Sequence, residues 1–220
     1  MLGKGEIFGN PYLGVFCSAN ENLAVVPITS DSEFMESVKS SLDVEAVIKM
    51  SVDGSSTVGS LMRFNSNGAI ASEFISNAEV KKLEGHLEVT KISQKFNAMG
   101  NNVLANDKGA LVHPSFSPET VEEISRALGV PVERGTIAGY KTVGSSAVIT
   151  NKGAIVHPHT STYEMEVFEK VLGIKPQICT ANYGTGQVGA CMIANSKGAV
   201  VGETSTPIEL GRIEEGLVLY

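Results

Sequence analysis

A fivefold internal repeat constrains this chain more than any other feature. Five glycines that each follow an apolar residue recur at intervals of 41 to 45 residues: Gly14, Gly59, Gly100, Gly144 and Gly189. The sixth residue after each glycine is Asn or Thr: Asn20, Asn65, Asn106, Thr150 and Asn195. The ninth is glycine in four of the five copies: Leu23, Gly68, Gly109, Gly153 and Gly198. The tenth is always alanine: Ala24, Ala69, Ala110, Ala154 and Ala199. A period of this length indicates stacked units, each of which covers the apolar face of its neighbour.

Each unit begins with a pattern typical of a β-hairpin. Between the glycine and the alanine, apolar residues lead into an Asn-x-x-Gly connection, and a second apolar run such as ALV at 110–112 follows. Asn and Gly both tolerate a positive φ, which tight hairpin turns use. We therefore expect strand, turn and strand in each of the five units.

A helix is expected to begin 16 or 17 residues after each repeat glycine. Three pairs there have the spacing of a capping box, in which a hydroxyl and a carboxylate bond free amides reciprocally: Ser30/Glu33, Ser161/Glu164 and Thr206/Glu209. Pro118 and Pro207 stand where the first helical position accepts proline.

Positions 21, 24 and 28 after the glycine form one helical stripe, and all of them are apolar. They are Met35, Val38, Leu42; Val80, Leu83, Leu87; Val121, Ile124, Leu128; Met165, Phe168, Leu172; and Leu210, Ile213, Leu217. Gly85 is a stop signal, so Leu87 is expected to lie beyond its helix. The pattern predicts five amphipathic helices that each bury one face.

The two ends of the chain are expected to meet. A further extended segment follows each helix, as at 44–50, except in the fifth unit, which ends at Tyr220. Glu6–Gly9 stand at the same distance before Gly14 as Thr136–Gly139 stand before Gly144. The N-terminal strand is therefore predicted to complete the fifth unit and to close a ring with few open sheet edges. The expected organisation is a single α/β domain over 1–220, with repeats at approximately 9–53, 54–95, 96–139, 140–182, and 183–220 plus 1–8.

Charge and cysteine content exclude several classes of protein. With 24 acidic and 17 basic residues the net charge is −7, so the chain has no general attraction for polyphosphates. Three cysteines without a C-x-x-C pair favour neither a disulfide framework nor a thiolate metal site. Neither a signal-like apolar stretch nor a run of about 18 apolar residues is present, which predicts a cytoplasmic protein without a membrane partner.

Several motifs resemble one known family. The runs FGNPYLGVFC, NNVLANDKGALVHP, TVGSSAVITNKGAIVHP and GTGQVGACMIANSKGAVVGETSTPIEL closely resemble the archaeal and eukaryotic translation initiation factor six family, and the likeness extends from about Glu6 to Leu217. The resemblance implies a pentein fold, a closed α/β propeller of five ββαβ repeats around a pseudo-fivefold axis with the helices outside. It also implies a protein that binds the large ribosomal subunit and prevents its association with the small subunit, without a cofactor and without catalysis.

The resemblance further implies a steric mechanism and a contact surface. A monomeric disc would lie on the intersubunit face beside a basic ribosomal protein and the sarcin-ricin loop of the ribosomal RNA, with no small-molecule substrate. In family members a rim of strand starts and turns near the axis carries the contact, which places Asn106 and Ser60 there, although eukaryotic relatives often carry arginine at the latter position. By neighbourhood and repeat symmetry we add Asn101, Asp107 and Asn195, and we expect a bulkier residue at position 106 to weaken subunit binding without unfolding.

Two motifs that suggest catalysis or cofactor binding are interpreted as structural. His113 and His157 each precede a proline at matching repeat positions, so a ring holds them apart, and His157-Pro-His159 lacks a third metal ligand. The glycines of GTGQVG at 184–189 lead into a predicted strand, whereas a dinucleotide-binding loop opens a helix. We therefore predict neither a metal nor a cofactor site.

Two alternative functions stay open. Other penteins are enzymes that modify guanidino groups with a cysteine nucleophile, and Cys191 is the candidate here; that chemistry needs a thiolate activated by a nearby base. The only His-x-Glu triplet, His86 to Glu88, follows a helix stop and does not open a helix. The other alternative is a protein-interaction scaffold unrelated to ribosomes.

Overall fold

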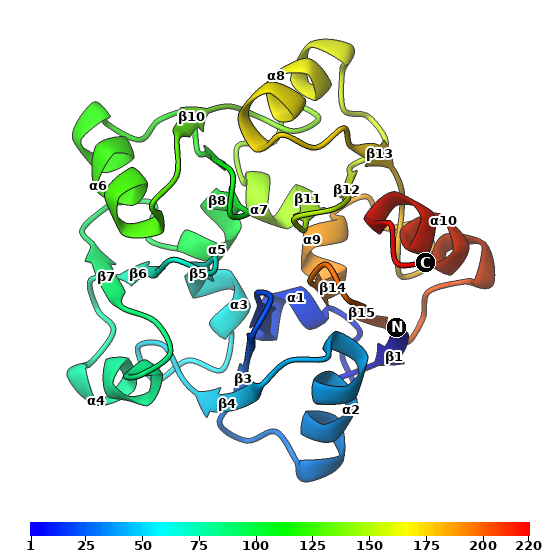
Figure 1. The fold of residues 1–220 in the computed structure, drawn as a ribbon, viewed down its shortest axis with the longest axis horizontal. Helices are drawn as coiled ribbons and strands as arrows, with labels where there is room; N and C mark the ends of the chain where they lie inside the picture. The colour runs from blue at the N-terminus through cyan, green and yellow to red at the C-terminus, as the bar shows by residue number, and fades with distance from the viewer.

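A computed structural model, which describes all of residues 1–220, arranges five three-stranded sheets around a central axis (Figure 1). The first strands are β2 (Ser18–Ala19), β5 (Met62–Phe64), β8 (Val103–Ala105), β11 (Ala147–Ile149) and β14 (Met192–Ala194). The second are β3 (Leu23–Pro27), β6 (Ala69–Ser72), β9 (Ala110–Val112), β12 (Ala154–Val156) and β15 (Ala199–Gly202). The third are β4 (Ala46–Met50), β7 (Val89–Ile92), β10 (Val132–Arg134), β13 (Gln177–Ile178) and β1 (Leu2–Gly5).

The register of the sheets repeats around the ring. In every unit the first and second strands are antiparallel, and the repeat alanine pairs with the last residue of the first strand, as Ala110 does with Ala105. The third strand joins the second in parallel. β1 pairs with β15, with Leu2 opposite Ala199, which confirms that the N-terminal segment completes the fifth sheet. Both chain ends therefore lie at the same place in the ring (Figure 1).

Two sets of helices surround the strands. The outer helices are α2 (Ser32–Leu42), α4 (Asn77–Val80), α6 (Pro118–Leu128), α8 (Thr162–Leu172) and α10 (Pro207–Leu217), which form the periphery in Figure 1. The axial helices, α1 (Leu13–Phe16), α3 (Val58–Leu61), α5 (Met99–Asn102), α7 (Val143–Ser146) and α9 (Val188–Cys191), surround the centre. The sequence pattern did not predict the axial helices, because one turn of helix is too short to show a periodicity.

The apolar core consists of five clusters, each of which combines residues of one unit with residues of its neighbour. α6 packs on β6 and β7 of the preceding sheet, α8 on β9, α10 on β12, and α2 on β1 and β15. One of the five apolar clusters, for example, joins Ile70 and Ile92 of the second sheet to Ile124 and Leu128 of α6. Since each cluster needs residues from two units, no unit can bury its apolar surface alone.

The predicted helical stripe is confirmed in full in four units and in part in the second. Its second member is always fully buried, and its first member is always half-buried. In the second unit α4 is followed by a 3-10 turn, Lys81–Leu83, so Leu87 does lie beyond the helix as expected. The helix α4 is short. The hairpin of the preceding unit carries Leu23 at the position where the other units carry glycine, and Leu23 packs in one cluster with Leu83.

The helix starts predicted from local sequence signals are found in most units. The capping boxes Ser161/Glu164 and Thr206/Glu209 are present, and Pro118 and Pro207 occupy the first turn as predicted. The expected pair Ser30/Glu33 is wrong, because Asp31 caps the helix by accepting from the Phe34 amide at 2.8 Å. A third capping box, Ser76/Glu79, was missed because the helix that it starts is short.

The Asn-x-x-Gly connections do not use positive φ, contrary to expectation. The side-chain oxygen of Asn106, for example, accepts from the amides of Lys108 and Gly109 at 3.0 and 3.1 Å, which closes the turn without a left-handed residue. The glycine is needed for space, since a Cβ on Gly109 would overlap the carbonyl oxygen of Val171 in α8. Positive φ occurs instead in the linkers between units, as at Ala138 and Gly139.

The repeat glycines are the contact points of the axial helices. A Cβ on any one of them would overlap the carbonyl oxygen of the repeat glycine in the neighbouring unit: Gly14 with Gly189, Gly59 with Gly14, Gly100 with Gly59, Gly144 with Gly100, and Gly189 with Gly144. The five helices therefore meet backbone to backbone around the axis.

Candidate functional site at the central axis

The predicted site residues lie at two ends of the axis. Each first strand runs from an axial helix, at what we call the helix end, to an Asn-x-x-Gly connection or its Thr150 counterpart, at the turn end. Asn106, Asp107 and Asn195 lie at the turn end, whereas Ser60 and Asn101 lie in α3 and α5 at the helix end. A three-residue strand spans roughly 10 Å. The structure therefore does not bring the five residues together into one rim.

Buried asparagines link the turns into a ring. The Nδ2 atom of each donates to the backbone carbonyl of the equivalent residue in the next unit: Asn20 to Asn65 at 2.8 Å, Asn65 to Asn106 at 3.1 Å, Asn106 to Thr150 at 3.2 Å, and Asn195 to Asn20 at 3.1 Å. Three of them also donate to the C-terminal carbonyl of an outer helix: Asn65 to Leu128, Asn106 to Leu172 and Asn195 to Leu42. Thr150 uses its hydroxyl within its own turn and donates to no neighbouring unit.

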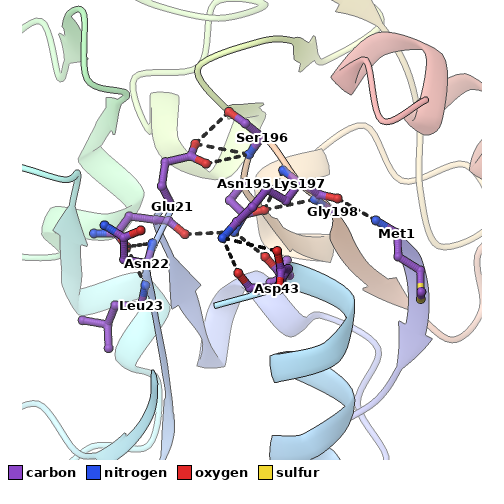
Figure 2. Close-up of polar contacts among 11 residues, drawn as sticks. Met1, Glu21, Asn22, Leu23, Asp43, Asn195, Ser196, Lys197 and Gly198 are labelled. Atoms are coloured by element: carbon purple, nitrogen blue, oxygen red, sulfur yellow. Dashed lines mark hydrogen bonds and ion pairs between the residues drawn. The ribbon is translucent and has the colours of Figure 1, made fainter. Parts of the chain in front are cut away.

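A second polar ring lies one residue further along each turn. It consists of Glu21, Ser66, Asp107, Asn151 and Ser196. The Asp107 carboxylate accepts from the amide and hydroxyl of Ser66, both at 2.8 Å, and from Nδ2 of Asn151 at 2.6 Å. The Glu21 carboxylate accepts from the hydroxyl of Ser196 at 2.7 Å, as Figure 2 shows. The turn end is thus a hydrogen-bonded surface with two carboxylates near the axis.

Lysines occupy the next turn position in three adjacent units. They are Lys108, Lys152 and Lys197, all exposed, whereas the other two units carry Asn22 and Asn67. Lys197 is bound to Asp43 through both the carboxylate, at 3.8 Å, and the carbonyl (Figure 2). Lys108 and Lys152 make no salt bridge. One side of the turn end therefore presents free cations outside the carboxylates.

Burial changes what can be inferred from Asn106. Its side chain is only 5% exposed and is hydrogen-bonded at both its oxygen and its nitrogen. A bulkier residue would remove these bonds, so we now expect the substitution to destabilise the ring and not to act on binding alone. Asp107 and Lys108, one and two residues on, are more exposed and report on the same surface.

The axis contains no cavity of the size that substrates need. The cavity at the turn end measures about 20 Å³, and the one beneath it, between the first strands, about 40 Å³. Small-molecule sites are typically roughly 300 to 1,000 Å³. No group of three or more His, Cys, Asp or Glu side chains is placed to hold a metal ion.

Cys191 has the environment of a core residue. It is fully buried, its thiol donates to the Gln187 carbonyl, and burial raises the pKa of the thiol to about 12. A nucleophilic cysteine needs its pKa lowered by a neighbouring cation or base. His86, in the only His-x-Glu triplet, lies on an exposed turn after the 3-10 segment.

The repeated histidines stabilise turns and stack on linker aromatics. Nδ1 of His113 accepts from the Ser115 amide and Nδ1 of His157 from the His159 amide, both at 3.1 Å. Their rings lie against Phe96 and Tyr140 with centroids 4.4 and 5.2 Å apart. Burial is the main cause that lowers the pKa of both imidazoles, which favours their neutral form. This arrangement gives the histidine of the shared motif K-G-A-(L/I)-V-H-P a local role in the turn that follows the second strand.

Three capping glutamates also hold the linkers between units. Glu79 accepts from the Ser51 hydroxyl at 2.7 Å and from the Gly54 amide at 3.1 Å. Glu164 accepts likewise from Thr136 and Gly139, and Glu209 from Thr180 and Gly184. Burial alone would raise the pKa of Glu79 and Glu164, but these hydrogen bonds and those of the capping boxes outweigh it and lower both to about 2. The pKa of Glu209 is lowered in the same way.

We expect these carboxylates to make the ring sensitive to acid. A folded-state pKa below the unfolded value stabilises the protein above about pH 4.5, and this contribution disappears as the pH falls toward 2. A shift of about two units corresponds to roughly 3 kcal/mol. Glu79→Gln should therefore lower the free energy of unfolding at pH 7 by about 2 to 3 kcal/mol and reduce its slope between pH 4.5 and 2. Urea unfolding across this pH range measures both quantities.

The matched control for the acid experiment is Glu166→Gln, which changes an exposed carboxyl on α8. It should leave the pH dependence of unfolding as it is in the unsubstituted protein. If Glu79→Gln also retained the full acid dependence, the linker bonds would not be its source.

Comparison with known proteins gives a match along nearly the whole chain. The family model described as the eIF-6 family matches residues 3–216. Translation initiation factor 6 of Methanococcoides burtonii is 46% identical over 217 residues, covering 99% of each chain. The protein of the same name from Archaeoglobus fulgidus is 41% identical over 214 residues, covering 97% of this chain and 99% of the relative. The one from Natronomonas pharaonis is 46% identical over 216 residues, covering 97% of each.

No helix is both long and apolar enough to cross a membrane. The match over residues 3–216, together with relatives of nearly the same length at 41 to 46% identity, shows that this chain belongs to the eIF-6 family of translation initiation factors.

Proposed function

We propose that this protein binds the large ribosomal subunit through its turn end and sterically prevents association with the small subunit. The observation that carries the proposal is the full-length likeness to proteins named translation initiation factor 6. In this proposal the fold is a pentein, and the protein acts in the cytoplasm as a monomer and without catalysis. Asp107 belongs to the contact surface, and Asn106 and Asn195, whose side chains are buried, hold the turns that carry it. Ser60 and Asn101 would meet only a partner that reaches the helix end.

The charges at the turn end suit a mixed partner. Glu21 and Asp107 near the axis offer carboxylate oxygens to a basic ribosomal protein, whose charge complements the net −7 of this chain. Lys108 and Lys152, which lie outside the carboxylates in adjacent turns, are free to contact phosphates of the sarcin-ricin loop. This division would let one face contact protein and RNA together.

A pre-organised surface favours a steric role. Hydrogen bonds from Asn20, Asn65, Asn106 and Asn195 tie successive turns together before any partner arrives. Docking then requires little ordering of the turns, which lowers the entropic cost of association. A rigid ring on the joining face blocks the small subunit by occupying its place.

The proposal is tested by co-sedimentation with purified large subunits and by light scattering during subunit joining. The unsubstituted protein should sediment with large subunits and reduce joining. Lys108→Glu combined with Lys152→Glu should weaken binding at least about tenfold and lower the slope of log affinity against log salt by about 1 to 2.

The control pair is Lys95→Glu combined with Lys141→Glu, two exposed lysines in linkers between units. This pair should bind as the unsubstituted protein does. The proposed function is wrong if the unsubstituted protein neither sediments with large subunits nor reduces subunit joining. If only the salt slope of the Lys108→Glu and Lys152→Glu pair is unchanged, the proposed RNA contact alone is wrong.

The two alternative functions make different predictions. An enzyme that hydrolyses guanidino groups would show arginine turnover abolished by Cys191→Ala, and such a result would overturn the proposal. A scaffold unrelated to ribosomes would fold normally yet fail the sedimentation experiment. The burial of Cys191 argues against the first alternative, and the family match argues against the second.

A further inference from the structure

We propose that the cavity between the first strands holds a small monovalent anion of halide size, bound by the guanidinium of Arg63. The proposal does not depend on ribosome binding. It rests on a half-buried cation without a counter-charge that lines a small cavity on the axis.

Arg63 is the one charged residue at its position in the repeat. Its equivalents, four residues after the repeat glycine, are Ser18, Leu104, Val148 and Ile193. The Arg63 side chain reaches into the next unit, where Nε donates to the Val103 carbonyl at 3.0 Å and Nη2 to the Gly100 carbonyl at 2.7 Å. A guanidinium has five N–H donors, so three have no hydrogen-bond partner in the protein.

No carboxylate compensates the charge. Both salt bridges of the protein lie elsewhere, and none of the 15 residues that line the cavity is acidic. Burial lowers the pKa of Arg63 to about 10, which still leaves the group charged at neutral pH. The Arg63 side chain is half-buried, so its charge is only partly hydrated, and an anion in contact with it would offset the cost of that loss of hydration.

The cavity has the right size and lining for one small ion. Its volume of about 40 Å³ holds roughly three water-sized species, each of which needs about 10 to 15 Å³. Gly14, Gly144 and Gly189 line it, which leaves room beside the guanidinium. Ser18 lines it too, and its buried hydroxyl has no hydrogen-bond partner, so it can rotate to donate to an ion.

Size and charge select among ligands. Phosphate, sulfate or a carboxylate-bearing metabolite would not fit beside the guanidinium in about 40 Å³. Water fits and accepts hydrogen bonds, but it provides no counter-charge. Glu21 and Asp107 line the neighbouring turn-end cavity and not this one, so they do not occupy the place of the anion.

Crystals grown with sodium bromide test the site directly. We expect one anomalous peak on the axis within hydrogen-bond distance of the Arg63 guanidinium. In solution the melting temperature should rise by roughly 3 to 6 °C when chloride replaces gluconate between 10 mM and 1 M at constant ionic strength, because only the folded ring binds the ion.

Two variants separate the site from general salt effects. Arg63→Met should lose both the peak and the chloride dependence, and Ser18→Ala should fold normally and weaken the chloride dependence several-fold. If Arg63→Met does not fold, the anomalous peak in the unsubstituted protein and the chloride dependence of Ser18→Ala still test the proposal. Water density alone on the axis, or equal chloride dependence in all proteins that fold, would overturn the proposal.

Discussion

Gly100→Ala is expected to prevent this protein from folding. A Cβ at that position would overlap the carbonyl oxygen of Gly59 and lie 2.7 Å from that of Met62. Both obstacles are backbone atoms of the neighbouring unit, so no side-chain rotation relieves the overlap. The axial helices would have to separate, and the five clusters between units would open with them. We expect a loss of at least about 4 kcal/mol, at the high end of single substitutions.

The measurement is the melting temperature together with the yield of folded protein after expression. Gly211→Ala is the matched control, because a Cβ there meets nothing within 4 Å. Gly211 lies inside α10, where alanine is favoured over glycine by about 0.5 to 1 kcal/mol, so this variant should melt slightly higher. A Gly100→Ala protein that melts near the unsubstituted one would show that the axial contacts are looser than described.

Asn106→Ala is expected to cost about 3 to 4 kcal/mol, because it leaves several buried groups without partners at once. The carbonyls of Thr150 and Leu172 lose their donor, and the amides of Lys108 and Gly109 lose their acceptor. The effect should appear as a lower midpoint in urea with an unchanged slope, since the folded and unfolded surfaces stay the same.

Asn106→Thr separates the turn from the links between units. The fourth unit shows how threonine behaves there, because the Thr150 hydroxyl accepts from the amides of Lys152 and Gly153 but donates to no other unit. The threonine variant should therefore keep its turn and lose only the two bonds that cross to the fourth unit, at roughly half the cost of alanine. Equal losses in both variants would show that the bonds between units contribute nothing.

The fold could be predicted from the sequence wherever a pattern repeats. Stripes such as Ile124 and Leu128 lie on one helix face in four of the five copies, and the position of the N-terminal segment before Gly14 was enough to predict its pairing with β15. The axial helices could not be predicted in this way, because four residues show no period. The helix start at Asp31 differed by one residue, since both Ser30 and Asp31 are residue types that cap helices.

The candidate site was less predictable, because position in the repeat does not tell how a side chain is used. Asn106 stands at a turn, where exposure is the usual expectation, yet its amide is used within the ring. Ser60 and Asn106 are near each other in the repeat pattern, but a strand separates them along the axis. The sequence shows that Arg63 is the one charged residue at its repeat position, but its lack of a counter-charge depends on which residues line a cavity.

The pairing of β1 with β15 has a consequence for how the chain matures. The amino group of Met1 donates to the Lys197 carbonyl, 196 residues away, and Leu2–Gly5 pair with Ala199–Gly202. During synthesis β1 therefore cannot pair with β15 until the fifth unit has emerged from the ribosome. Contacts of such long sequence separation form slowly. We infer that earlier units accumulate as partly covered intermediates and that the ring becomes rigid in a single late step. If the protein docks as the preformed disc proposed above, closure of the ring would be the event that makes it competent to bind.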